Sequence, residues 1–304
     1  MDHRLWTMDQ LNYSNIILQP IQPAWLPPQL EAAMLRLDLL HPEVSGNKWF
    51  KLKQNLEQAK AAGKTRIVTF GGAWSNHIAA TAAACRLTGL QSTGIIRGEA
   101  APVLSLTLQQ AQGYGMQLRF ISREAYKQKD NTDWEVQYPD GSIIPEGGHN
   151  AAGAAGCKEI LSLAPTQHFT HILCPVGTGT TLAGLINSAQ PQQQVLGIAV
   201  LKGATYLQQE VETLLESPAT ANWQLLHDFH GGGYAKASPA LIDLINDFYT
   251  QTRVPLDMIY TGKMVWGLQQ LVQQGYFAPG SRLLLIHTGG LQGNLSLPSG
   301  VLCF

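Results

Sequence analysis

The sequence predicts an α/β protein with open, mainly parallel sheets flanked by helices. Short apolar runs alternate with helical patterns from Ala33 onward, which is typical of that fold class. Several runs lack strict alternation of polar and apolar residues, as expected of strands covered by helices on both faces. With 304 residues, 45% of them apolar and 13% charged, the chain is long enough for about two domains.

Most of the predicted strands are followed by a predicted helix. The strands are expected at 33–40, 66–70, 93–97, 117–122, 171–176, 195–200, 223–229 and 282–288. The helices are expected at 48–62, 77–90, 103–114, 151–164, 181–189, 205–216, 239–251 and 263–275. Segment 127–150 is rich in Asp, Asn, Pro and Gly and is the least regular, so it is expected to join two units.

Composition and charge argue against several classes of function. The formal net charge is -1 and no block of like charges occurs, so nothing indicates binding to nucleic acid or to an anionic membrane. The cysteines contain no C-x-x-C pair, which argues against a zinc site or a disulfide framework; they are Cys85, Cys157, Cys174 and Cys303. Without a secretion signal or a membrane span in the sequence, we expect a cytoplasmic protein that acts on small molecules.

Glycine-containing loops after the predicted strands are the candidate ligand sites, because ligands bind at the carboxyl ends of strands in such sheets. In the first loop Lys48 begins a helix, where the helix dipole and nearby cations disfavour its ammonium form. Lys48 is therefore a candidate amine nucleophile, or else a solvated lysine of the first turn. In the second loop Ser75, Asn76 and His77 begin a helix whose free N–H groups can hold a carboxylate, although Ser75 or Asn76 could simply cap the helix.

A third loop has the composition of a phosphate site. It follows the strand at 171–176 and contains the run Gly177, Thr178, Gly179, Thr180 and Thr181. Its amides and hydroxyls can cradle a phosphate group, but the run lacks the Walker lysine and the third glycine of a dinucleotide motif. A single phosphate therefore fits better than a nucleotide, and a plain connecting turn is the alternative.

The C-terminal part adds more hydroxyl groups. Tyr260 and Thr261 precede another predicted helix, and the segment 285–294 contains paired glycines. His227 and His230 are three residues apart, but they fall at a strand end that runs into a glycine-rich turn. We therefore favour a structural or pocket-lining role for them and expect no metal site.

Taken in order, these motifs resemble those of a known family. The motifs are GNK, GGAWSNH, GTGTT, YTGK and HTGG, and the resemblance extends from about Ala33 to Gly290. They resemble the pyridoxal-phosphate enzymes of the tryptophan-synthase-β fold, and among these the 1-aminocyclopropane-1-carboxylate deaminase and D-cysteine desulfhydrase family. The resemblance implies pyridoxal 5'-phosphate as the cofactor, an amino acid as the substrate and a homodimeric protein.

The resemblance also implies roles for the cofactor-binding residues. Lys48 would bind the cofactor aldehyde covalently, and Lys51 would lie close to the phosphate. Asn76 would bond to the pyridoxal 3-oxygen and contact the substrate, and 177–181 would bind the phosphate. Thr261 would face the pyridine nitrogen, at a position where the deaminases have a Glu.

Other residues would contact the substrate. Ser75 and the amides leading into His77 would take its carboxylate, and Trp74 would lie in the same pocket, where many relatives have Gln. Tyr234 and Tyr260 match the two tyrosines that approach the substrate in the deaminases, and they would act on the leaving group.

The neutral hydroxyl of Thr261 resembles the desulfhydrase branch. We therefore expect a lyase that performs α,β-elimination on a D-amino acid such as D-cysteine and releases a 2-oxo acid, ammonia and sulfide. The alternatives are ring opening of 1-aminocyclopropane-1-carboxylate, and a pyridoxal-phosphate-binding protein without catalysis. We expect 1–50 and 155–304 to form a larger cofactor-binding domain and 51–154 a smaller one, with 145–156 lining the pocket between them.

Overall fold

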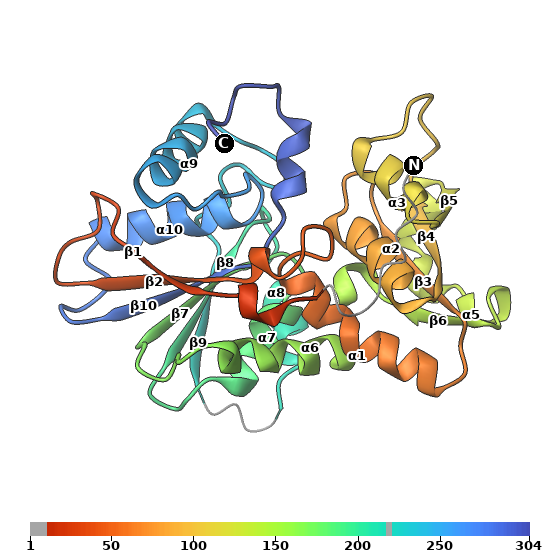
Figure 1. Cartoon of the computed structure of the whole chain (residues 1–304), viewed down its shortest axis with the longest axis horizontal. Coiled ribbons are helices and arrows are strands. Elements are labelled where there is room, and N and C mark those ends of the chain that lie inside the picture. Colours follow the sequence, from red (N-terminus) through yellow and green to blue (C-terminus); the bar gives the residue numbers. More distant parts are fainter. Residues whose placement is uncertain (1–10, 217–220) are drawn as a thin grey trace.

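The computed structural model describes residues 11–216 and 221–304, and they form two sheets that lie side by side (Figure 1). The large sheet has the strand order β1-β2-β10-β7-β8-β9, and the small sheet has the order β5-β4-β3-β6. All neighbouring strands are parallel except β1 and β2. The predicted class, open and mainly parallel sheets, is confirmed.

The strands of the large sheet are β1 (Leu18–Ile21), β2 (Glu31–Arg36), β7 (His171–Val176), β8 (Gln194–Ala199), β9 (Asn222–Leu226) and β10 (Arg282–His287). Those of the small sheet are β3 (Arg66–Gly71), β4 (Gln91–Arg97), β5 (Gln117–Ile121) and β6 (Gly141–Ile144). The central strands are almost entirely buried, which explains their continuous apolar runs.

The helices are α1 (Asn47–Ala61), α2 (Asn76–Thr88), α3 (Leu106–Gly113), α4 (Arg123–Lys127), α5 (Trp134–Gln137), α6 (Ala151–Cys157), α7 (Thr180–Ser188), α8 (Leu207–Glu212), α9 (Pro239–Thr252) and α10 (Thr261–Gln273). In Figure 1, α9 and α10 cover one face of the large sheet, and α6 and α7 cover the other. Two large apolar clusters fill the space between these layers. The large sheet therefore has helices on both faces, as the sequence predicted.

The predicted elements differ from the structure in several places, and the predicted helix at 151–164 is divided into α6 and the 3₁₀ turn η6 (Lys158–Leu163). The sequence assigned 127–150 to an irregular joint, but this segment contains α4, α5 and β6, and β6 pairs with β3 to complete the small sheet. The four-residue strands β1 and β6 were missed because each is too short for a periodic signal, and β1 holds a proline at a sheet edge. The segment 37–40 leaves the strand as a 3₁₀ turn, η3 (Leu37–Leu39), and α8 is half the predicted helix.

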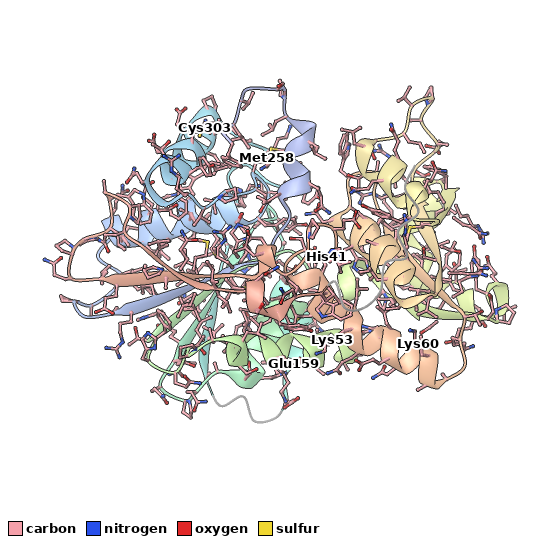
Figure 2. All side chains as sticks on the ribbon, viewed as in Figure 1. His41, Lys53, Lys60, Glu159, Met258 and Cys303 are labelled. Atoms are coloured by element: carbon pink, nitrogen blue, oxygen red, sulfur yellow. The ribbon has the colours of Figure 1, made fainter. Side chains whose placement is uncertain are left out.

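Helix α1 lies between the two sheets, where it packs against α6 and α2. Gly156 of α6 permits this packing, because a Cβ atom there would lie 1.9 Å from the carbonyl oxygen of Phe50. Figure 2 labels Lys53 on α1 beside Glu159 on η6 (Lys158–Leu163), and the two side chains form an ion pair. The N-terminal half of α1 is thus held against α6 and η6.

Candidate active site

A cavity of about 690 Å³ lies between the two sheets, within the size range of small-molecule sites. Its walls come from segments that follow β3, β4 and β6 in the small sheet and β7, β8 and β10 in the large sheet. Most of the predicted site residues line it: Lys48, Lys51, Trp74, Ser75, Asn76, His77, Gly177, Thr178, Gly179, Thr181, Tyr234 and Tyr260. The side chains of Thr180 and Thr261 do not.

The turn before α1 positions Lys48. Gly46 has a φ of +64°, and a Cβ atom there would lie 2.0 Å from the carbonyl oxygen of Thr288, so the close packing requires glycine. Asn47 Nδ2 donates to Thr181 Oγ1 at 2.8 Å, and Lys48 Nζ donates to Asn47 Oδ1 at 2.7 Å. The amine is therefore anchored to the loop that follows β7.

The environment of Lys48 favours a neutral amine. Burial and, after it, the charge of Lys51 lower the pKa of Lys48 to about 7. Its Nζ lies 5.8 Å from the ring centroid of Tyr260. Burial also lowers the pKa of Lys51, whose Nζ donates to Thr178 Oγ1 at 3.3 Å. The structure thus joins a lysine that can act as a nucleophile to a second lysine at the phosphate loop.

Asn76 carries the clearest sign of a missing ligand. Both polar atoms of its amide are buried and have no hydrogen-bond partner among the described residues. Leaving them unpaired costs free energy, so a polar ligand atom is expected there. The neighbouring Ser75 caps α2 by accepting from the backbone N–H of Ile78 at 3.3 Å, and it also lines the cavity.

His77 is held as a neutral acceptor. Thr69 Oγ1 donates to the carbonyl oxygen of Ile144, so it accepts from His77 Nε2, with 2.8 Å for each bond. The other ring nitrogen, Nδ1, therefore carries a lone pair, and it has no partner among the described residues. Burial, followed by the charges of Lys48 and Lys51, lowers the pKa of His77 to about 3. A carboxylate at this helix start would bind to backbone N–H groups, because the imidazole has only a lone pair to offer.

The loop after β7 has the form of a phosphate cradle. Gly179 caps α7 with a φ of +83°, and the first N–H groups of a helix have no intrahelical partner. The hydroxyl of Thr178 bonds to Lys51 at the cavity. Thr180 is fully buried, and its Oγ1 lies 3.2 Å from His149 Nδ1 and 3.3 Å from Thr178 Oγ1. Its role in binding a phosphate stays a prediction.

Tyr234 and Tyr260 meet edge to face at the cavity, with ring centroids 6.4 Å apart. A Cβ atom at Gly177 would lie 3.1 Å from Tyr260 Cε1, so glycine leaves room for this ring beside the phosphate loop. Burial raises the pKa of Tyr234, and burial with the neighbouring Tyr234 raises the pKa of Tyr260 well above its ordinary value. Both phenols therefore stay protonated at neutral pH and can donate a proton.

Thr261 differs from its predicted setting. It is fully buried, and its Oγ1 donates to Asp257 Oδ2 at 2.6 Å and accepts from the Asp257 backbone N–H at 2.8 Å. Asp257, also fully buried, accepts from the backbone N–H groups of Ile259, Tyr260 and Thr261 as well. The resemblance implied a neutral hydroxyl facing the pyridine nitrogen, and the structure pairs that hydroxyl with the carboxylate of Asp257, just before α10.

Several cavity residues were not singled out from the sequence: Arg97, Lys129, Asp130, Glu146, Leu201, Tyr206, Leu207 and Glu210. Arg97 had a usable signal, because it is the last residue of a predicted strand at the ligand-binding edge. Glu146 and His149 fall in 145–156, which the resemblance implied would line the pocket. Glu210 lies in α8 and pairs with His149, with Oε2 to Nε2 at 2.6 Å, a contact that no local pattern reveals.

His227 and His230 do not line the cavity. His230 Nδ1 accepts from the Gly232 backbone N–H at 3.0 Å, which supports the local turn. Over the described ranges 11–216 and 221–304, no group of three His, Cys, Asp or Glu side chains is arranged to hold a metal ion. In the same ranges no helix has the length and apolar character required to cross a membrane.

Comparisons with known proteins agree with this geometry. The family model described as "Pyridoxal-phosphate dependent enzyme" matches residues 23–289. A bifunctional D-cysteine desulfhydrase/1-aminocyclopropane-1-carboxylate deaminase of Arabidopsis thaliana is 29% identical, with 88% of this chain and 74% of that protein covered. A D-cysteine desulfhydrase of Salmonella newport is 26% identical, with 86% and 87% covered.

Solved structures show the same fold. The crystal structure of an ACC deaminase homologue aligns with a TM-score of 0.77 at 23% identity, covering 96% of this chain and 94% of that one. O-ureido-L-serine synthase aligns with a TM-score of 0.71 at 14% identity, covering 99% and 97%. At these identities the likeness concerns the fold and not the substrate.

Proposed function

The chain belongs to the pyridoxal-phosphate-dependent enzymes, and from that premise we propose that it eliminates the β-substituent of a D-amino acid such as D-cysteine. The products would be sulfide, ammonia and pyruvate. The observation that carries the proposal is the meeting, in one cavity, of the Lys48 amine, the unpaired Asn76 amide and the two protonated phenols. A relative that is named a D-cysteine desulfhydrase supports the choice of substrate class.

The residues present fit the cofactor. Lys48 would bind its aldehyde, because an amine with a pKa of about 7 is largely available as a nucleophile near neutrality. The unpaired amide of Asn76 would bond to its ring oxygen, and the amides of 177–181 with the hydroxyl of Thr178 would hold its phosphate. When bound, the cofactor supplies an electron sink that acidifies the α-carbon of an attached amino acid.

This chain's own groups then move protons and hold the substrate. The N–H groups at the start of α2, with Ser75, would take the α-carboxylate. The Lys48 amine, free once the substrate has replaced it, would accept the α-proton. As the bond from Cβ to sulfur breaks, the electron pair leaves with sulfur, and Tyr260 or Tyr234 would give it a proton. Water converts the released 2-aminoacrylate to pyruvate and ammonia.

The experiment is to offer the purified, cofactor-loaded protein D-cysteine, L-cysteine and 1-aminocyclopropane-1-carboxylate separately and to identify the 2-oxo acid. We expect pyruvate and sulfide from D-cysteine. If the cofactor absorption band is present but neither these compounds nor a wider set of amino acids give a product, the proposal is overturned and a non-catalytic binding protein is favoured. Pyruvate from L-cysteine alone would refute the assigned stereochemistry.

Ring opening of 1-aminocyclopropane-1-carboxylate is the second candidate, and the buried Asp257 favours it. The hydroxyl of Thr261 is bonded to this carboxylate, so its neutrality does not argue against a protonated cofactor ring. Thr261→Glu, which would introduce the residue that the deaminases have at this position, would press two carboxylates together in a buried site. The product 2-oxobutyrate is the better discriminator.

The homodimeric state and the cytoplasmic location expected from the resemblance also belong to this proposal. Light scattering during size-exclusion chromatography tests the homodimeric state, and the expected mass is twice the chain mass of 33.1 kDa. Fractionation of the cells that produce the protein tests the second, and recovery with the membrane pellet would contradict it.

A further inference from the structure

Besides Lys48 and Lys51, two charged side chains of the cavity wall have no ion-pair partner among the described residues. Lys129 pairs with Asp130 at 2.9 Å, and Glu210 pairs with His149 at 2.6 Å. In the described part of the chain, neither Arg97 nor Glu146 takes part in an ion pair, although both line the cavity. The phenol of Tyr126 lies near both, and burial, followed by the charge of Glu146 and a hydrogen bond with it, raises the pKa of that phenol. The mechanism proposed above uses neither group.

Arg97 is held in place without a carboxylate. It ends β4, and its guanidinium lies beside Gly72, whose ideal Cβ position is 3.4 Å from Nη2 and 3.9 Å from Cζ. Its Cζ also lies 5.8 Å from the ring centroid of Tyr126. A Cβ atom at position 72 would make ordinary van der Waals contact with the guanidinium, so Arg97 lies against the loop that leads into α2. Its N–H donors remain available to a ligand.

Glu146 stands on the other side of the same loop. It begins the turn η5 (Glu146–Gly148), directly after β6, and Gly147 and Gly148 fix that turn with φ values of +68° and +67°. Because β3 lies between β4 and β6, the backbones at Arg97 and Glu146 are about 10 Å apart, two strand spacings. The two charges therefore flank the 72–77 loop that would hold the substrate.

Both charges act on Tyr234. Burial is the main cause of the raised pKa of Tyr234; among the charges, Glu146 raises that pKa and Arg97 lowers it. All three residues line the same cavity, so a substituent that departs past Tyr234 would be exposed to the field of both charges.

We propose that Arg97 and Glu146 form a distal subsite for the substrate's β-substituent, and that the preferred substituent carries a second amino-acid head with a carboxylate and an ammonium. Arg97 would take the carboxylate and Glu146 the ammonium. A head of this kind bonded at both ends spans about 8 Å, which suits the separation of the two backbones once the side chains extend inward. A simple anion would be attracted by Arg97 but repelled by Glu146, so the dipolar head fits better.

This inference rests on the proposed elimination and extends it to bis-amino-acid thioethers and disulfides. In a thioether, the bond from Cβ to sulfur breaks, the electron pair goes to sulfur, and a phenol proton completes a thiol amino acid. The other half leaves as 2-aminoacrylate, which water converts to pyruvate and ammonia. Besides the substrate, the overall reaction consumes only water.

Binding to the holoprotein tests the subsite apart from turnover. Calorimetry would compare three D-amino acids that have no leaving group: D-2-aminoheptanoate, D-2-aminopimelate, and 2,6-diaminopimelate in its D,D and meso forms. We expect one form of diaminopimelate to bind at least about tenfold more tightly than the other two compounds. In Arg97→Gln and in Glu146→Gln this preference should fall to about threefold or less. Arg123→Gln, a nearby exposed arginine that does not line the cavity, should keep it.

The outcomes separate the two proposals. Equal binding of all three ligands, or a preference that survives both substitutions, would overturn the subsite even where D-cysteine is turned over. Tighter binding of aminopimelate than of diaminopimelate would overturn the role of Glu146 and leave a site for anions. A preference that depends on both residues, together with no 2-oxo acid from D-cysteine or from the stereoisomers of cystathionine, would keep the subsite and reject the elimination.

Discussion

Two lysines follow similar turns in this molecule, Lys48 after Gly-Asn and Lys263 after Thr-Gly, and each lies in the first turn of a helix. Burial lowers the pKa of both, to about 7 for Lys48 and about 8 for Lys263. Only Lys48 lines the cavity. Lys263 is fully buried, and its Nζ donates to the carbonyl oxygen of Gly233 at 2.5 Å.

The comparison shows that a lowered pKa does not by itself make a nucleophile. The amine of Lys263 is already bonded to the turn that precedes Tyr234. In that turn Gly231, Gly232 and Gly233 all have positive φ values. Such a turn is strained for any other residue and needs an anchor. We therefore assign Lys48 to chemistry and Lys263 to the placement of Tyr234.

The largest effect should come from Lys48→Ala. Without the amine, the cofactor cannot be held covalently and the α-proton has no acceptor, so kcat should fall at least about a thousandfold. The absorption band of the protein-bound cofactor should disappear as well. Lys263→Met is the matched control and should keep the band. Full activity in Lys48→Ala would refute the assignment.

Lys263→Met should have a smaller effect of a different kind. The carbonyl of Gly233 loses its donor, Tyr234 is displaced, and kcat/KM should fall by between about tenfold and a hundredfold. The unpaired carbonyl should cost about 1–3 kcal/mol of unfolding free energy, offset in part because no charge is buried. Steady-state kinetics and urea denaturation measure both quantities. Unchanged kinetics with lowered stability would leave Lys263 a purely structural role.

Sequence reasoning found Lys48 and Asn76 because each lies in a local motif, next to glycines that a close turn requires. Neither the anchor of Lys263 nor the partner of Thr261 could be found this way. The first depends on a contact across 30 positions, and the second on how α10 begins. The local sequence around a lysine near a glycine at a helix start does not show whether its amine faces a cavity or a backbone carbonyl.

The same limit applies to the fold. Long buried strands such as β7 and β10 can be predicted from their continuous apolar composition. Strand β6 has only four residues, and its strand conformation depends on pairing with β3, which local sequence does not reveal. Its recognition matters for function, because β6 delivers Glu146 to the cavity. Local pattern therefore singled out most of the cavity residues in the turns before α1, α2 and α7, but not Arg97 or Glu210.

The pH dependence of cofactor attachment would distinguish Lys48 from a lysine with an ordinary pKa. Only the neutral amine attacks an aldehyde, and with a pKa of about 7 the neutral fraction of Lys48 rises with pH up to that value. The rate of attachment to cofactor-free protein should rise by up to about tenfold per pH unit below pH 7 and level off above it. Stopped-flow absorbance follows this rate. A rate that keeps rising to pH 10 would mean an ordinary lysine.

The smallest effect should come from Asp257, the one charge that raises the pKa of both lysines. In Asp257→Asn that support disappears, so the midpoint of the attachment profile should move to lower pH by less than about one unit, because burial remains the larger cause. Asp247→Asn, an exposed carboxylate on α9, is the control and should not move it. A midpoint that rises in Asp257→Asn would mean that this carboxylate acts on Lys48 through the packing of Tyr260 and Thr261 and not through its charge.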